Sequence, residues 1–84
     1  MHLRQDGLTW QVVGEDVVVL DLDGSIYLKL NGTGRVLWER LAQPASEDDL
    51  VAALTERYDI DRERATTDVA AFVAELRRRE LVVD

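Results

Sequence analysis

Cysteine is absent from this 84-residue sequence, and proline and histidine each occur once. Without thiols the chain can form neither a disulfide framework nor a cysteine-ligated metal site, which fits a reducing cytoplasm. The single histidine, His2, lies in a terminus that we expect to be frayed. Because acyl-transfer catalysis needs a nucleophile beside a positioned base, the sequence predicts a protein that is not an enzyme.

Long hydrophobic runs are also missing. No segment approaches the roughly 18 apolar residues of a membrane span, and the first residues lack the apolar stretch of a secretory signal, so we expect a soluble, cytoplasmic protein without a membrane partner. Basic residues are outnumbered 10 to 17 by acidic ones, and the formal net charge is -7. This charge repels a phosphate backbone and argues against nucleic acid as a partner, whereas it would attract a basic peptide.

The composition that remains is that of a globular protein. Hydrophobic residues make up 46% of the chain and charged residues 32%, so we expect one folded domain over residues 1–84. No metal or other cofactor is expected. The acidic residues around Asp21 lack the fixed ligand spacing of a calcium loop, and the segment Gly32-Thr33-Gly34 lacks the further glycines or the lysine of a phosphate loop.

The first third of the chain has the pattern of β-strands. Apolar residues and turn signals predict strands at 8–13, 17–20 and 25–30, with turns at 14–16 and at Asp23-Gly24, which together form a three-stranded antiparallel meander. Side chains alternate between the two faces of a strand. We therefore expect Ile26, Leu28 and Leu30 to face the core, and Ser25, Tyr27 and Lys29 to face away.

The rest of the chain has helical periodicity. Thr33 is the expected N-cap of a short helix that runs to Ala42, and Ser46 begins a second helix with an arrangement like a capping box. The last helix is expected from about Arg62 to Arg79, before a short strand at 81–83. The expected buried residues of the second and third helices are Leu50, Val51, Leu54, Tyr58, Ala65, Val69, Phe72, Val73 and Leu76.

Three strands followed by three helices, with a tight turn between the last two helices, are typical of a winged helix-turn-helix. The predicted fold class is therefore α+β. A DNA-binding regulator is the alternative function for this topology, since arginines occur in the last helix at 62, 64 and 77–79. Acidic residues are interspersed among them, and the helix dipole already accounts for cations in a final turn, so we do not favour this alternative.

The third strand carries the main functional hypothesis. As the edge of the sheet it leaves main-chain donors and acceptors unpaired, and an extended peptide can add there as a further strand, a mode called β-augmentation. Lys29 could instead be only the kind of lysine that protects an edge from aggregation. The last helix has a nearly uncharged face that would leave a groove if it lay along this edge. That face consists of Thr66, Thr67, Ala70, Ala71 and Ala74.

Several blocks of the sequence resemble those of one family. The blocks are Trp10, the strand Val17-Val18-Val19-Leu20-Asp21, the motif Tyr27-x-x-Leu30-Asn31-x-Thr33-Gly34-x-x-x-Trp38, and Asp68-Val69-x-x-Phe72-Val73-x-x-Leu76 before Leu81-Val82. In this respect the chain is similar to PqqD-like RiPP recognition elements, the leader-binding domains of ribosomal peptide biosynthesis. It looks most like the stand-alone recognition subunit of lasso-peptide pathways.

The resemblance implies that the leader of a precursor peptide adds as a strand along 25–30 and packs against the last helix. Its implied partners are that leader, a leader-cleaving cysteine protease and a cyclase, and it implies a scaffold role in core, turn and cap for Trp10, Leu30, Asn31, Thr33 and Trp38. Val69 and Phe72 could instead belong to the core, and the flank of the last helix that meets the peptide stays open. The implied peptide-binding residues are Ser25, Ile26, Tyr27, Leu28, Lys29, Leu30, Asp68, Val69, Phe72, Val73, Glu75, Leu76 and Arg77.

Overall fold

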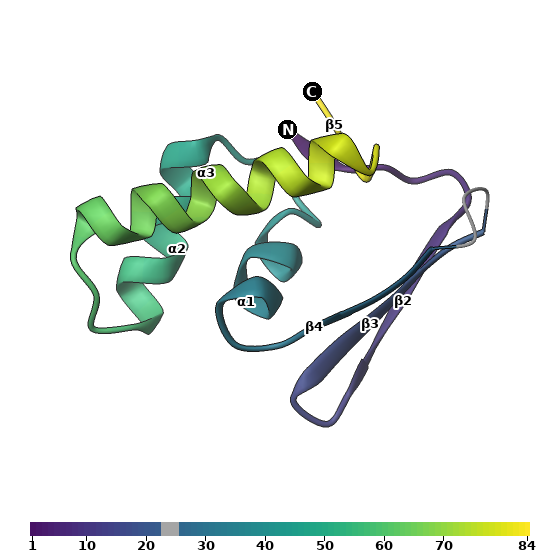
Figure 1. Ribbon diagram of the computed structural model, residues 1–84, viewed down its shortest axis with the longest axis horizontal. Coiled ribbons are helices and arrows are strands. Elements are labelled where there is room, and N and C mark those ends of the chain that lie inside the picture. The colour runs from purple at the N-terminus through teal and green to yellow at the C-terminus, as the bar shows by residue number, and fades with distance from the viewer. Residues whose placement is uncertain (23–25) are drawn as a thin grey trace.

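The computed structural model describes residues 1–22 and 26–84, so the expected Asp23-Gly24 turn and Ser25 lie outside the described residues. Figure 1 shows a small sheet on one side and the helices on the other. Along the chain the elements are β1 (His2–Leu3), β2 (Leu8–Val13), β3 (Asp16–Asp21), β4 (Ile26–Leu30), α1 (Gly32–Arg40), α2 (Glu47–Arg57), α3 (Arg62–Arg78) and β5 (Val82–Val83).

The main sheet is the predicted meander. Its strands lie in the order β2-β3-β4, and both pairings are antiparallel. Within the described part of the chain, β4 pairs with β3 alone and therefore forms an edge of this sheet. Together with the three helices, this sheet confirms the predicted α+β fold.

The core lies between the inner face of the sheet and the helices. Val17 and Val19 of β3 are buried there, and Leu28 and Leu30 of β4 pack against the same core. On the opposite face Tyr27 is 63% exposed, and Lys29 is also exposed. The predicted alternation of β4 is thus confirmed for its described side chains, because a pleated strand turns successive residues to opposite faces.

The N-terminus is not frayed, contrary to our expectation for His2. β1 pairs with β5 in a second, two-stranded antiparallel sheet, with His2 opposite Val83. The terminal ammonium of Met1 also donates a hydrogen bond to the carbonyl of Ala45 at 2.8 Å. A strand of two residues has no periodicity to detect, so the sequence pattern missed β1.

The start of α1 differs from the prediction as well. Asn31, not Thr33, is the N-cap, and its side chain makes no capping hydrogen bond. Its carbonyl instead accepts hydrogen bonds from the N–H groups of Gly34 and Arg35. The capping box of α2 is confirmed, because the Ser46 and Asp49 side chains each accept the other's main-chain N–H.

Candidate functional site

The open edge of β4 presents the main-chain groups of two particular residues. In an antiparallel sheet, pairs that exchange hydrogen bonds alternate with pairs that do not. The N–H of Leu22 donates to the carbonyl of Gly7 at 2.8 Å, so Leu22 and Gly7 form a hydrogen-bonded pair. The registers of β2 with β3 and of β3 with β4 continue from this pair without a bulge, and the alternation along them makes Val19 and Leu28 a hydrogen-bonded pair. Leu28 therefore directs its N–H and C=O toward β3. Tyr27 and Lys29 therefore direct theirs outward, to the open edge.

The Lys29 side chain does not cover this edge. Its ammonium lies 3.3 Å from a carboxylate oxygen of Asp16 in β3. Because Asp16 belongs to the neighbouring strand, the ion pair draws the lysine over the outer face of the sheet and away from the free side of β4. Within the described part of the chain, the outward main-chain groups of Tyr27 and Lys29 thus face no paired strand.

α1 passes close to both β4 and α3 at Gly34. A β-carbon placed on Gly34 of α1 would lie 3.4 Å from Leu30 Cδ2 and 3.7 Å from Phe72 Cε1. Leu30 and Phe72 are partly buried and pack against the core. We call the surface formed by Leu28, Leu30, Gly34 and Phe72 beside the open edge the β4–α3 groove.

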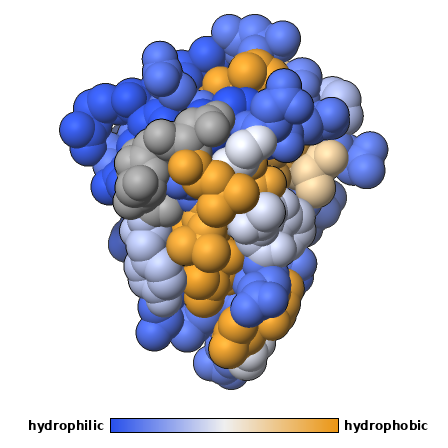
Figure 2. Space-filling model, turned by 90° about the vertical axis from the view of Figure 1, so that its right-hand side faces the viewer, coloured by the Kyte–Doolittle hydropathy of each residue, from blue (hydrophilic) through white to orange (hydrophobic). Residues whose placement is uncertain are grey.

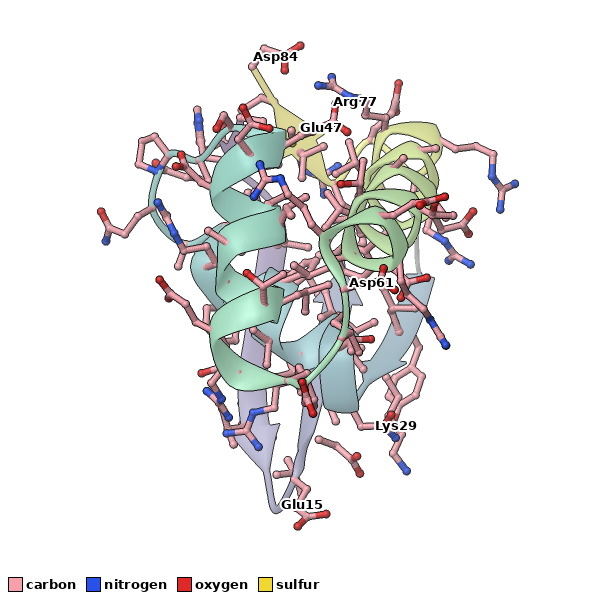
Figure 3. All side chains as sticks on the ribbon, turned by 90° about the vertical axis from the view of Figure 1, so that its left-hand side faces the viewer. Glu15, Lys29, Glu47, Asp61, Arg77 and Asp84 are labelled. Atoms are coloured by element: carbon pink, nitrogen blue, oxygen red, sulfur yellow. The ribbon has the colours of Figure 1, made fainter. Side chains whose placement is uncertain are left out.

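The approach of Phe72 to Gly34 fixes the flank of α3 that faces the groove. At 100° per residue, Asp68 and Glu75 lie within about 60° of Phe72 around the helix axis, whereas Arg77 lies about 140° away. The Arg77 guanidinium forms two hydrogen bonds, of 3.0 and 2.8 Å, with the carboxylate of Asp84. Figure 3 shows Arg77 and Asp84 at the end of the molecule remote from Lys29. Arg77 is therefore not a groove residue.

Three residues that the resemblance assigned to the pocket belong to the core. Val69, Val73 and Leu76 have exposed fractions of 0%, 4% and 1%. Apolar side chains this deeply packed support the groove from behind but offer no surface to a peptide. This result decides the alternative for Val69, which is a core residue, while Phe72 keeps part of its ring accessible.

The uncharged face of small residues on α3 does not line the groove. Thr66, Thr67, Ala70, Ala71 and Ala74 are all exposed, and each lies about 100° or more around the helix from Phe72. The residues that the sequence reasoning missed lie elsewhere. Gly34 forms the floor of the groove. Arg79 comes two helical turns after Phe72 and lies only about 20° from it around the helix axis, so it lies on the same side of the helix as Phe72.

Charges on the groove flank of α3 are largely paired. Glu75 accepts hydrogen bonds from Arg78 and Arg79, and these arginines hold the pKa of the Glu75 carboxyl below its usual value. Asp68 has a looser partner, since Arg64 lies 3.8 Å away. Asp68 is consequently the carboxylate of this flank that a cationic side chain could reach with less competition.

The two tryptophans have different roles in the scaffold. Trp38 of α1 is completely buried, as the scaffold assignment expects, whereas Trp10 of β2 remains 37% exposed. Their rings meet edge to face with centroids 6.2 Å apart. Trp10 thus covers the core at its margin instead of lying within it.

The outer face of the sheet has an apolar surface of its own. Val13, Leu20 and Leu22 are substantially exposed there, and Figure 2 shows hydrophobic side chains gathered on this side of the molecule. Among residues 1–22 and 26–84, no cluster of three or more potential metal ligands occurs. No helix among these same residues is long and apolar enough to cross a membrane.

Comparisons with known proteins relate this geometry to a family. Residues 16–82 match the model of the family described as coenzyme PQQ synthesis protein D (PqqD). The solved structure of TbiB1 in complex with the TbiA(beta) leader peptide is similar over 100% of both chains, with 25% sequence identity and a TM-score of 0.87. Lasso peptide synthetase B1 complexed with the leader peptide is similar over the same extent, with 26% identity and a TM-score of 0.84. No curated protein matches significantly. Because the family model spans most of the sequence, the chain belongs to the PqqD family.

Proposed function

We propose that this protein binds the leader segment of a ribosomally made precursor peptide by β-augmentation at the open edge of β4. The single observation that carries the proposal is the position of this edge beside the partly exposed ring of Phe72. The leader-peptide complexes of the two similar structures support it. The protein acts by binding and not by catalysis, in the cytoplasm, where the precursor is synthesised.

Both parts of the site contribute to binding in this proposal. The outward N–H and C=O groups of Tyr27 and Lys29 pair with an extended leader, and each such hydrogen bond contributes about 0.5 to 1.5 kcal/mol net. Apolar leader side chains that point toward the helix pack on Leu30, Gly34 and Phe72. The main-chain bonds supply affinity for any strand, while this apolar contact supplies selectivity for particular leaders.

Electrostatics favours a leader with basic residues. The net charge of -7 attracts cations at long range, and this attraction weakens as salt is added. At short range Asp68 lies on the groove flank with only a 3.8 Å partner. A lysine or arginine of the leader would therefore meet Asp68 more readily than Glu75.

The bound leader is delivered, in this proposal, to a leader-cleaving cysteine protease and a cyclase. A strand added to the edge of β4 leaves the outer face of the sheet uncovered, so Leu20 stays available to an enzyme while the leader is bound. The substitution Leu20→Ser should then weaken co-purification with the protease and leave leader affinity unchanged. Loss of leader binding in this variant would contradict the separation of the two surfaces.

A titration with isotope-labelled protein tests the binding proposal. The probe is the TbiA(beta) leader peptide, which is bound in one of the two similar structures. We expect amide shifts concentrated at 26–30 and around Phe72, and none with a scrambled peptide of the same composition. Amide shifts confined to residues of α2, or saturable binding of the scrambled peptide, would overturn the proposal.

No observation favours the DNA-binding alternative. The arginines in and just after α3 all lie within ion-pair distance of a carboxylate, so they do not form a free basic surface. Binding to duplex DNA releases counterions and falls steeply with salt. We expect no duplex binding at physiological salt, and a titration with a short labelled duplex checks this directly.

A further inference from the structure

Arg4 connects three separate parts of the fold at one end of the β4–α3 groove. Its guanidinium donates to the carboxylate of Asp21 at 2.6 Å, to the carbonyl of Glu80 at 3.0 Å and to the carbonyl of Asp6 at 2.9 Å. Its main-chain N–H donates to Leu81 at 2.9 Å. One side chain thus joins the segment after α3, the end of β3 and the chain between β1 and β2.

Two partners of Arg4 lie at the ends of the elements that border the groove, Asp21 beside the start of β4 and Glu80 just after α3. Asp21 is opposite Ile26, the first residue of β4, so its position sets where β4 begins. Glu80 lies two residues after the last residue of α3 and has a positive φ of 58°, a strained conformation for a residue other than glycine. The carboxylate of Asp21 is almost completely buried, with 4% of its side chain exposed, which makes this ion pair costly to leave half-formed.

At the opposite end, the walls meet through Leu30, Gly34 and Phe72. Apart from these two ends, few residues of α3 and β4 approach each other, because β4 contacts mainly β3. The distance between the helix and the open edge is therefore set by the packing around Gly34 at one end and by Arg4 at the other. Figure 1 shows the end of α3 beside the β1–β2 connection, which runs on from there to the upper end of the main sheet.

We propose that Arg4 is a positioning residue, which holds α3 at the spacing from β4 that a leader strand requires. This inference rests on the proposed function. Arg4 does not touch the leader; it reduces the conformational freedom that binding would otherwise have to remove. A guanidinium is suited to this role because its planar fork serves several acceptors at fixed angles, whereas a lysine ammonium is a flexible point charge.

The substitution Arg4→Lys tests the proposal, because it retains a cation beside Asp21 but loses the three-way bridge. We expect the affinity for the leader peptide that binds the wild-type protein to fall about tenfold. This corresponds to about 1.4 kcal/mol of binding free energy, which the variant loses because binding must then order α3 relative to β4. The matched control is Arg77→Lys, which alters an arginine with two hydrogen bonds on the other flank of α3 and should leave affinity unchanged. Calorimetric titrations below the melting temperature of each variant give these affinities.

A distance measurement separates positioning from simple loss of stability. The chain has no cysteine, so Gln11→Cys in β2 and Ala70→Cys in α3, both at exposed sites outside the groove, accept two spin labels specifically. In Arg4→Lys we expect a broader distance distribution between sheet and helix, which narrows when the leader binds. In Arg77→Lys the distribution should match that of the wild type.

The results distinguish failure of this inference from failure of the proposed function. If the unmodified protein does not bind the leader, the proposed function fails. If it binds and Arg4→Lys binds equally well, or binds weakly with an unchanged distance distribution, the positioning role is overturned. Should Arg4→Lys not fold, Asp21→Asn, which retains the hydrogen-bond acceptor but removes its charge, provides the same comparison and should show a smaller broadening.

Discussion

Gly34 of α1 and Phe72 of α3 approach so closely that a β-carbon on the glycine would lie 3.7 Å from Phe72 Cε1. This distance is ordinary van der Waals contact, as is the 3.4 Å to Leu30 Cδ2. The glycine therefore leaves room for about one methyl group beside Leu30 and Phe72. Leader side chains would find room there because Gly34 has no side chain.

The substitution Gly34→Ala should stabilise the free protein and weaken leader binding. Alanine fits the available space, and its helix propensity exceeds that of glycine by about 1 kcal/mol in a helix interior, somewhat less in a first turn. Urea denaturation should show an equal or higher midpoint, while calorimetry shows lower leader affinity. A clear loss of stability would mean that the space beside Leu30 and Phe72 cannot accept the added methyl group.

The substitution Phe72→Ala should weaken both stability and leader binding. Because the ring is only partly buried, we expect a loss of about 2 kcal/mol, less than the 3 to 5 typical of a fully buried phenylalanine. The matched control is Val69→Ala, where a fully buried side chain contributes about 2 kcal/mol to stability. Val69→Ala should retain leader affinity when measured well below its melting temperature. Equal losses of affinity in both variants would mean that Phe72 acts only through stability.

The substitution Lys29→Pro should reduce leader affinity by about tenfold while the protein stays folded, because it removes one outward N–H and inserts a ring into the path of the added strand. The other edge of the sheet offers a matched control. By the same alternation of hydrogen-bonded pairs, Val12 of β2 also directs its N–H outward. Val12→Pro should fold and bind the leader normally. Circular dichroism and calorimetry check both variants, and unchanged affinity in Lys29→Pro would count against the edge.

Stability should decrease in acid. Hydrogen bonds from Ser46 hold the pKa of Asp49 below its usual 3.8, and those from Arg78 and Arg79 hold the pKa of Glu75 below its usual 4.5. A carboxyl whose pKa is lower in the folded state stabilises the protein above its unfolded pKa, and this contribution is lost as the pH falls through the folded value.

Denaturation midpoints measured as the pH falls below about 4.5 test this expectation. Asp49→Asn retains an acceptor for the capping hydrogen bond but cannot titrate. Its midpoint should therefore fall less steeply with decreasing pH than that of the wild type. An identical slope in the two proteins would show that the capping box contributes nothing to the acid dependence.

The strands and helices themselves could be predicted from local patterns. The alternation in β4 identified Leu28 and Leu30 as inward-facing, and the apolar spacing in α3 identified Val69, Val73 and Leu76 as one stripe. These patterns reflect constraints within a single element, such as the pleat of a strand or the turn of a helix. Periodicity alone could not distinguish a core stripe from pocket walls, since both are apolar.

What the sequence by itself determined is the set of elements, their inward faces and the acidic charge of the whole chain, because each depends on neighbouring residues or on composition. Only the tertiary structure decided that Phe72 faces the groove and Arg77 does not, that His2 pairs with Val83, and that Arg4 joins Asp21 to Glu80. These relationships join residues far apart in the chain, whose proximity follows from how the helices pack on the sheet and has no local signature in the sequence.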